Sequence, residues 1–132
     1  MNAKPKVLVV DDDPDILDAI VTVLGTQPYS VDSARDGVEC LEKVRSEIPN
    51  LILLDLLMPK KDGFAVVREL RENPKYARIP ILILTSVRED ASRRRYELET
   101  GLAMDVQDYL EKPVAPVDLL ERVRALLHKG QS

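Results

Sequence analysis

Acidic, hydroxyl and amino side chains follow directly on the apolar segments of this sequence. Three consecutive aspartates, Asp11 to Asp13, follow the first segment, and Asp55 interrupts the apolar stretch 51–58. Thr85 and Lys112 follow two later segments. Carboxylates that meet in a partly desolvated cleft repel one another, and a lysine or a hard divalent cation relieves that repulsion. If these residues converge, we expect a metal-assisted phosphate site.

Phosphoryl transfer to a carboxylate is the chemistry that such a set supports. A carboxylate can attack a phosphoryl group to give an acyl phosphate while a metal ion neutralises the developing charge. Asp55 is the candidate nucleophile, and Lys112 and Thr85 are candidates to hold the phosphoryl oxygens. Mg²⁺, or Mn²⁺, is the expected cofactor, because such cations prefer oxygen ligands and often share them with phosphate.

Five short apolar segments are predicted to be the strands that position these residues. Three are almost continuously hydrophobic, which is typical of parallel strands buried on both faces. They cover 6–10, 51–54 and 79–84. Two weaker segments, 29–34 and 106–110, are predicted to be edge strands.

Helical patterns separate the strands. Asp13 and Pro14 form an N-cap and first helical position before an apolar face that reaches Leu24, and Asp36 is expected to cap a second helix. Further helices are predicted over 64–70, 89–100 and 117–127. Val38, Leu41 and Val44 are expected to face inward on the second helix, and Val117 belongs to the apolar face of the last.

The helix over 89–100 is predicted to be the loosest of the five. Its three arginines, Arg93 to Arg95, leave little more than Ala91, Leu98 and Tyr96 for an apolar stripe. A helix with few buried apolar contacts has a low local stability.

Alternation of strands and helices predicts an α/β fold of the flavodoxin-like type, a three-layer (βα)5 doubly wound parallel sheet. In the strand order 2-1-3-4-5 the first and third strands are neighbours, so Asp11, Asp12 and Asp55 would converge. Ligands of such sheets bind outside the carboxyl ends of the strands. We expect one domain over 1–132, with a core of about 5–128 and no output domain.

Composition excludes several classes of protein. The net charge of −4 is spread over the 132 residues, which disfavours direct binding of nucleic acid. The single cysteine, Cys40, cannot form an internal disulfide, and no apolar segment has the length of a membrane span or a signal core. The expected location is the cytoplasm, without contact to a membrane.

Four motifs of this chain resemble response-regulator receiver domains of two-component signalling, similar to the stand-alone chemotaxis regulator. They are VLVVDDDPDIL from Val7, LILLDLLMPKKDG from Leu51, PILILTS from Pro80 and DYLEKPV from Asp108. The motifs follow the order of the family at close to its spacing, and the resemblance covers nearly the whole chain.

The resemblance implies a phosphoacceptor and its metal site. Asp55 would be phosphorylated, and Mg²⁺ would be bound by Asp12, Asp55 and the backbone carbonyl of Leu57. Asp11 would act on the metal largely through water. The protein would catalyse its own phosphorylation and slow dephosphorylation and would not be an enzyme in the ordinary sense.

The resemblance also implies a switch and a set of partners. Thr85 and Lys112 would contact the phosphoryl group, and Tyr109 would turn inward when the Thr85 hydroxyl moves. The peptide bond before Pro113 is expected to be cis. The phosphoryl donor would be a histidine kinase or histidine phosphotransfer protein, and the chain would be a monomer or a phosphorylation-dependent dimer that signals by binding a protein target.

One segment departs from the family pattern, and two rival functions remain. The stretch Gly101 to Gln107 is a few residues longer than usual, which favours a tolerated surface insertion over an interface. A small Mg-dependent phosphohydrolase would use Asp11 as its nucleophile but would leave Asp55 without a role. An interaction module that is never phosphorylated would not need the acidic, Thr85 and Lys112 set. A calcium loop fails, since Ile16 stands where a glycine is required.

Overall fold

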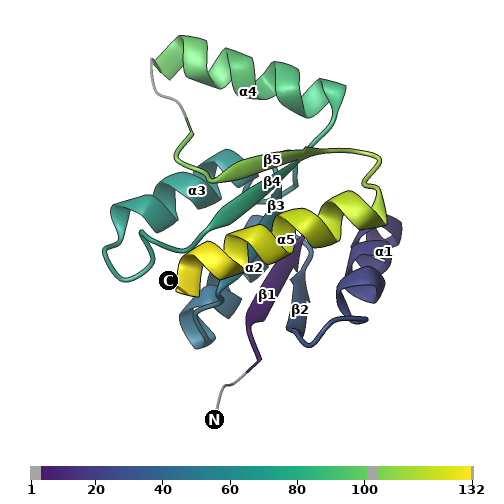
Figure 1. Cartoon of the computed structure of the whole chain (residues 1–132). Helices are drawn as coiled ribbons and strands as arrows, with labels where there is room; N and C mark the ends of the chain where they lie inside the picture. Colours follow the sequence, from purple (N-terminus) through teal and green to yellow (C-terminus); the bar gives the residue numbers. More distant parts are fainter. Residues whose placement is uncertain (1–3, 101–103, 132) are drawn as a thin grey trace.

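Strands and helices alternate along the chain in the computed structural model, which describes residues 4–100 and 104–131 (Figure 1). The described elements, in chain order, are β1 (Lys6–Val10), α1 (Pro14–Leu24), β2 (Ser30–Ala34), α2 (Gly37–Ser46), β3 (Leu51–Asp55), α3 (Gly63–Glu72), β4 (Ile81–Thr85), α4 (Val87–Thr100), β5 (Asp108–Glu111) and α5 (Pro116–Gln131). No described helix combines the length and the apolar character needed to cross a membrane.

The five described strands form one parallel sheet in the order β2-β1-β3-β4-β5. This confirms the predicted fold class and strand order, with β2 and β5 at the edges. Val7 of β1 pairs with Val31 of β2 on one side and with Leu51 of β3 on the other. Because β1 and β3 are parallel neighbours, their carboxyl ends lie side by side, and so do the first residues that follow them.

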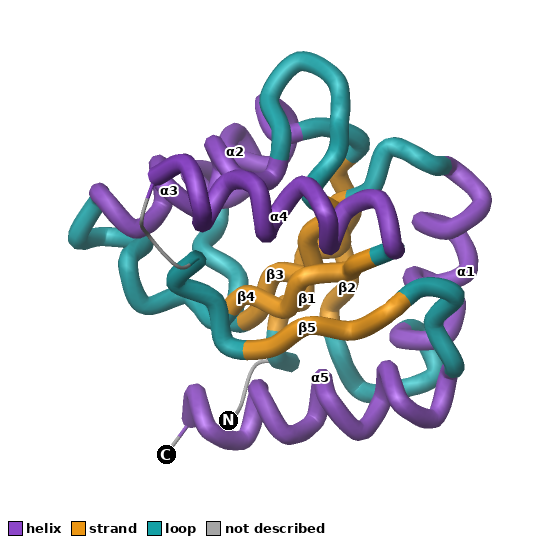
Figure 2. Tube along the Cα trace, turned by 90° about the horizontal axis from the view of Figure 1, so that it is seen from above, coloured by secondary structure: helices purple, strands orange, loops and turns teal. Residues whose placement is uncertain are grey.

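The two faces of the sheet are covered by different helices (Figure 2). On one face, apolar side chains of the central strands pack against α1 and α5; Val9, Leu53 and Leu84 belong to this cluster. On the other face, alternate strand residues such as Val10 and Leu54 pack against α2 and α3. Central strands that are buried on both faces explain the near-continuous apolar runs of the sequence.

Aspartates begin three of the helices at the carboxyl edge of the sheet. The Asp13 carboxylate accepts hydrogen bonds from the backbone N–H groups of Asp15 and Ile16, at 2.9 and 3.4 Å. Asp36 caps α2 and Asp62 caps α3 in the same way. The predicted caps at Asp13 and Asp36 are confirmed, and each cap satisfies backbone donors that the first helical turn leaves unpaired.

Two valines predicted to face the core are exposed. Val38 is 41% exposed and Val117 is 67% exposed, so both predictions were wrong. Each valine is the second residue of its helix. The first apolar side chains after these valines that pack against the sheet lie two residues farther along each helix, at Cys40 of α2 and Leu119 of α5, and both are buried.

Helix α4 packs differently from its neighbours on the same face. None of its side chains that the structure describes, Ala91 to Leu98, is buried. Leu98 is 85% exposed and Ala91 is exposed, so neither forms the apolar stripe for which it was a candidate, whereas Tyr96 is half-buried. Among the described residues, two ring contacts join the helix to other elements. Tyr96 stacks on Phe64 of α3 at 4.8 Å, and Arg93 lies over the ring of Tyr109.

The described part of the segment between α4 and β5 is anchored to the sheet and to α3. Residues 101–103 of the predicted longer loop lie outside the described residues. The Gln107 side chain accepts a hydrogen bond from Ile81 N at 2.7 Å, and Gln107 N donates to Ile81 O. Arg71 of α3 donates to the backbone oxygen of Asp105 at 2.8 Å. These contacts fix the register in which the chain enters β5.

Candidate functional site

Three aspartates meet at the carboxyl edge of the sheet. Asp11 and Asp12 follow β1, and Asp55 is the last residue of β3. One carboxylate oxygen from each lies within 4.8 Å of the others. Asp11 and Asp55 are 1% and 2% exposed, whereas Asp12 is exposed. The predicted convergence is therefore confirmed, and the cluster is buried on one side and open to solvent at Asp12.

Lys112 brings a positive charge to the buried side of the cluster. Its Nζ lies 3.0 Å from Asp11 Oδ2 and 3.6 Å from Asp55 Oδ1. The backbone N–H of Lys112 donates to Thr85 O at 2.6 Å, which continues the pairing of β4 with β5. The Lys112–Pro113 peptide bond is cis, as predicted. One ammonium group faces three carboxylates, so the site retains a negative charge that favours a cation.

The oxygen atoms of the cluster fit a hard divalent cation. Asp11 Oδ2 is buried, forms an ion pair with Lys112 Nζ and accepts no hydrogen bond from the described residues. Asp11 Oδ1 accepts from Asp13 N at 3.0 Å. A buried oxygen with an unused lone pair is costly unless a ligand satisfies it. Mg²⁺ takes carboxylate oxygens and retains several waters, which suits a cluster with one open side.

Two glycines hold the loop that follows Asp55. Gly63 N donates to Leu56 O at 2.8 Å, and Gly37 N donates to Lys61 O at 3.1 Å. A Cβ at Gly63 would lie 2.6 Å from Asp55 O, and one at Gly37 would collide with the Lys61 backbone. The loop is therefore clamped between the starts of α2 and α3.

The role of Gly37 was missed at the level of sequence, although a signal was present. Both glycines follow an aspartate that caps a helix, and Asp62-Gly63 is a pair of residue types that is typical of turns. The same pair occurs at Asp36-Gly37, but its partner, Lys61, is distant in the sequence. Nothing local predicts such a contact.

Thr85 lies beside the acidic cluster, and Tyr109 lies farther away. Asp55 pairs with Leu84, so Thr85 ends β4 one residue beyond this pair, and it is 8% exposed. Tyr109 of β5 pairs with Ile83, which precedes Thr85 by two residues. The structure thus groups Thr85 with the aspartates and Lys112, while the half-buried Tyr109 occupies a neighbouring position under α4.

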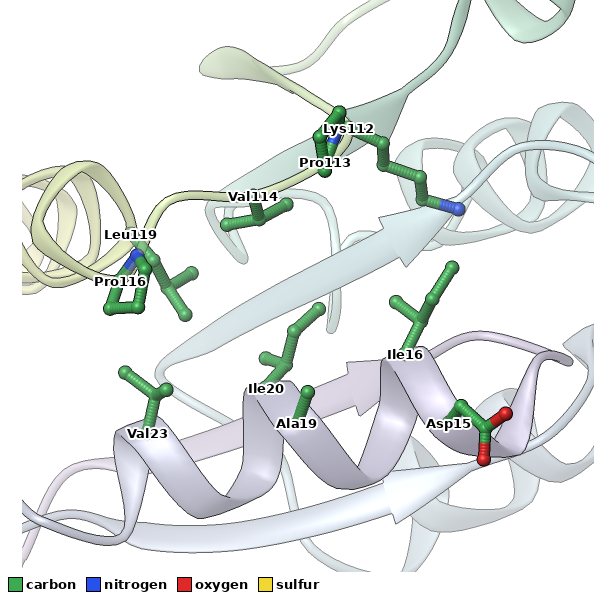
Figure 3. Close-up of a pocket in the computed structure, with 10 residues that line it drawn as sticks. All are labelled: Asp15, Ile16, Ala19, Ile20, Val23, Lys112, Pro113, Val114, Pro116 and Leu119. Carbon is green, nitrogen blue, oxygen red and sulfur yellow. The ribbon is translucent and has the colours of Figure 1, made fainter.

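An apolar groove of about 520 Å³ adjoins the site between α1 and the segment that joins β5 to α5 (Figure 3). Lys112 and Asp15 also line it, and Figure 3 shows the Lys112 side chain extending away from the apolar ones. The apolar lining consists of Ile16, Ala19, Ile20, Val23, Pro113, Val114, Pro116 and Leu119. The sequence did not predict this groove, because its two walls come from opposite ends of the chain.

The fold and the site together define a class: a doubly wound α/β domain with an acidic cluster and a lysine at the carboxyl edge of its sheet. The family model of the response regulator receiver domain matches residues 7–124. The chain therefore belongs to the response regulator receiver domain family, as its motifs predicted.

Named relatives agree with this assignment. Response regulator MprA of Mycobacterium avium is 41% identical over 124 residues, which are 94% of this chain and 51% of that protein. The probable transcriptional regulator ycf27 of Porphyridium aerugineum is 40% identical over 96% of this chain and 49% of its own length. The chain spans about half the length of the curated relatives it matches.

Solved structures show the same architecture. Chemotaxis response regulator CheY4 of Vibrio cholerae has a TM-score of 0.79 and 29% identity, with coverage of 93% of this chain and 98% of that one. The receiver domain of the Francisella response regulator 1452 has a TM-score of 0.78 and 30% identity, with coverage of 96% and 98%. The chain is accordingly a signalling phosphoacceptor domain of the two-component type, and the phosphohydrolase alternative is not favoured.

Proposed function

We propose that Asp55 is the phosphoacceptor and that it takes the phosphoryl group from a phosphohistidine of a histidine kinase or histidine phosphotransfer protein. The observation that carries this proposal is the position of Asp55. Its carboxylate is buried at the end of a central strand, 3.6 Å from Lys112 Nζ and beside Asp11 and Asp12. A buried carboxylate in such a cluster is a candidate for chemistry.

The transfer needs no group beyond those of the donor and this chain, apart from a divalent cation. An Asp55 carboxylate oxygen attacks phosphorus in line. The new O–P bond forms while the N–P bond to the donor histidine breaks, and the imidazole nitrogen keeps the electron pair. The groups proposed to hold phosphoryl oxygens are the Thr85 hydroxyl and Lys112, whose Nζ lies 3.6 Å from Asp55 Oδ1. Mg²⁺ or Mn²⁺, when bound, neutralises part of the charge that develops.

The same site also hydrolyses the acyl phosphate slowly. A water attacks phosphorus, the bond from phosphorus to the Asp55 oxygen breaks, and inorganic phosphate leaves while the carboxylate is restored. The chain thus catalyses both its own phosphorylation and its own dephosphorylation. Asp12, Asp55 and the Leu57 carbonyl are the proposed direct ligands of the cation, and Asp11 supports it largely through water.

The donor protein is proposed to contact the apolar groove beside Lys112. The groove is continuous with the site, because Lys112 lines both. The proposed occupant is a helix of the donor protein, whose apolar face would pack between α1 and Val114 and whose surface histidine would then reach Asp55. In Ala19→Arg, the long side chain enters the groove from an exposed position of α1. Transfer from the donor protein should fall about tenfold or more, while phosphorylation by a small donor should be unchanged.

The signal is proposed to leave through α4, β5 and α5. Phosphorylation changes the population of two states of Thr85 and Tyr109, and a partner that binds one state better reads the change. The chain would act as a monomer or as a dimer that forms on phosphorylation.

A small phosphodonor tests the assignment of Asp55 directly. Incubation with acetyl phosphate and Mg²⁺ should add one phosphoryl group to the wild type, and chelation of the metal should prevent the addition. Asp55→Asn should remain unmodified. Mapping by mass spectrometry would overturn the proposal if the label lay on Asp11, as the phosphohydrolase alternative requires. Unchanged signalling by Asp55→Asn would instead favour the interaction module.

A further inference from the structure

Arg93 of α4 covers the ring of Tyr109. The guanidinium carbon lies 4.6 Å from the ring centroid, within the range of a cation–π contact. Arg93 Nη1 also lies 2.8 Å from Glu97 Oε1, one helical turn farther along α4. The guanidinium is therefore oriented by a carboxylate while it stacks on an aromatic face, and its side chain is only 23% exposed.

The covered ring belongs to the face of the sheet that carries Thr85. Paired residues of parallel strands point to the same face, and Tyr109 pairs with Ile83. Thr85, two residues after Ile83, points the same way. The Tyr109 ring packs against the core cluster of this face, and Figure 2 shows α4 over the same side of the sheet. The ring is thus enclosed between the core and Arg93.

We propose that Arg93 is the positioning residue that ties α4 to Tyr109, so that a change in the ring's position moves α4. No described side chain of α4 is buried, and among the described residues a second ring contact joins Tyr96 of α4 to Phe64 of α3. The proposal rests on phosphorylation of Asp55, because that reaction supplies the change near Thr85 to which the ring responds.

Linkage makes the proposal measurable. If occupancy of the phosphoryl site alters the contact between Arg93 and Tyr109, removal of that contact must alter the affinity of that site for a stable phosphoryl mimic by the same factor. A cation–π contact of ordinary strength corresponds to about a 2- to 10-fold change in an equilibrium constant. Arg95, two residues farther along α4, supplies the control, because it carries the same charge on the same helix and is exposed.

The first measurement follows side-chain NMR signals of the wild type. The δ protons of Arg93 should be shifted by the ring current of Tyr109, and those of Arg95 should not. Addition of Mg²⁺ and acetyl phosphate should move the Arg93 signals and leave those of Arg95 in place. Arg93 signals that do not respond, in a protein shown to be phosphorylated on Asp55, would overturn the proposal.

The second measurement compares Arg93→Met with Arg95→Met. Methionine has a helix propensity close to that of arginine, so neither change weakens α4 through its backbone. Arg93→Met should shift the ring signals of Tyr109 and change the affinity of the Asp55 site for beryllium fluoride, a stable mimic of the phosphoryl group, about 2- to 10-fold. Arg95→Met should leave the Tyr109 signals in place and change the affinity by less than about twofold. Arg93→Lys should be intermediate, because it keeps the charge but loses the planar group that stacks.

The outcomes separate the two proposals. Equal behaviour of Arg93→Met and Arg95→Met, with normal modification of Asp55 in both, would overturn the role of Arg93 and leave the proposed function intact. A wild type that is never modified on Asp55 would overturn both proposals.

Discussion

Helices α2, α3 and α4 lie on the same face of the sheet but differ in how they are packed. We call the part with α2 and α3 the well-packed half of this face and the part with α4 the loosely packed half. Helices α2 and α3 bury apolar side chains such as Val44 and Leu70 against the strands. Helix α4 lies on the same face and buries none of its described side chains. Apolar burial is the main source of local stability, so α4 should open at a lower free energy than α3.

The well-packed half also fixes the site. Gly37 and Gly63, at the starts of α2 and α3, hold the loop that follows Asp55 through backbone hydrogen bonds. Movement of this loop would therefore disturb two helices that pack on the core. Helix α4 follows Thr85 of the site after a single residue, Ser86, and its Arg93 covers the ring of Tyr109. A firmly held reaction site beside a weakly packed helix is compatible with a two-state signalling domain.

The largest expected effect comes from truncating one leucine in each half. Leu70→Ala in α3 removes a side chain that is 1% exposed, and it should lower the free energy of unfolding by about 3 kcal/mol. Leu98→Ala in α4 removes an exposed side chain and should change it by less than about 0.5 kcal/mol. Urea unfolding measures both. Equal losses would mean that α4 is packed as firmly as α3.

A smaller effect is expected from adding a methyl group at the clamp. The Cβ of Gly63→Ala would lie 2.6 Å from Asp55 O, and we expect a loss of about 2 kcal/mol in the free energy of unfolding. Gly25→Ala is the matched control. Gly25 lies at the end of α1 with a φ of −65°, which alanine can adopt, and its nearest contact for a Cβ is 3.2 Å, to Val21 O. Gly25→Ala should therefore change stability by less than about 1 kcal/mol. Similar results for the two variants would argue against the clamp.

The buried thiol of α2 predicts a pH dependence of stability. Burial, with smaller contributions from Asp36 and Glu39, raises the pKa of Cys40 from 9.0 to about 12. Above pH 9 the unfolded chain loses the thiol proton while the folded chain keeps it. The contribution of the thiol to stability is therefore full below pH 9 and is lost as the pH rises toward 12.

The slope attributable to Cys40 should approach about 1.4 kcal/mol per pH unit in this window. Because lysines and tyrosines titrate in the same range, the measurement compares the wild type with Cys40→Ala by urea unfolding at several pH values. The difference between the two proteins should shrink as the pH rises. A constant difference would show that the α2 side of the core admits water or counterions to the thiol.

The smallest effect is expected at the ring contact that joins α3 to α4. The stacked rings of Phe64 and Tyr96 should contribute a coupling energy of about 1 kcal/mol. A double-mutant cycle with Phe64→Leu and Tyr96→Leu measures it, with unfolding free energies as the readout. Hydrogen exchange gives the second readout, because each single variant should speed exchange of α4 amides and leave those of α3 unchanged. Additive losses would remove this contact from the account of how α4 is held.

Local patterns were sufficient for most of the fold. The caps at Asp13 and Asp36 and the five apolar strands follow from side-chain chemistry that acts within a few residues, and all are confirmed. The errors at Val38 and Val117 have a common cause. Helical periodicity gives the direction of a side chain, but it does not say whether a strand lies beneath the first turn.

The amino-acid sequence by itself determined the strand-and-helix pattern, the strand order and the set of residues at the site. Asp11, Asp12, Asp55 and Lys112 meet because parallel strands must end at one edge, and a sequence encodes where strands end. Only the tertiary structure decided that Gly37 holds the loop after Asp55 and that the groove forms. It also decided that Arg93 covers Tyr109. Those contacts join segments that are distant in the chain, and their formation depends on how the helices pack.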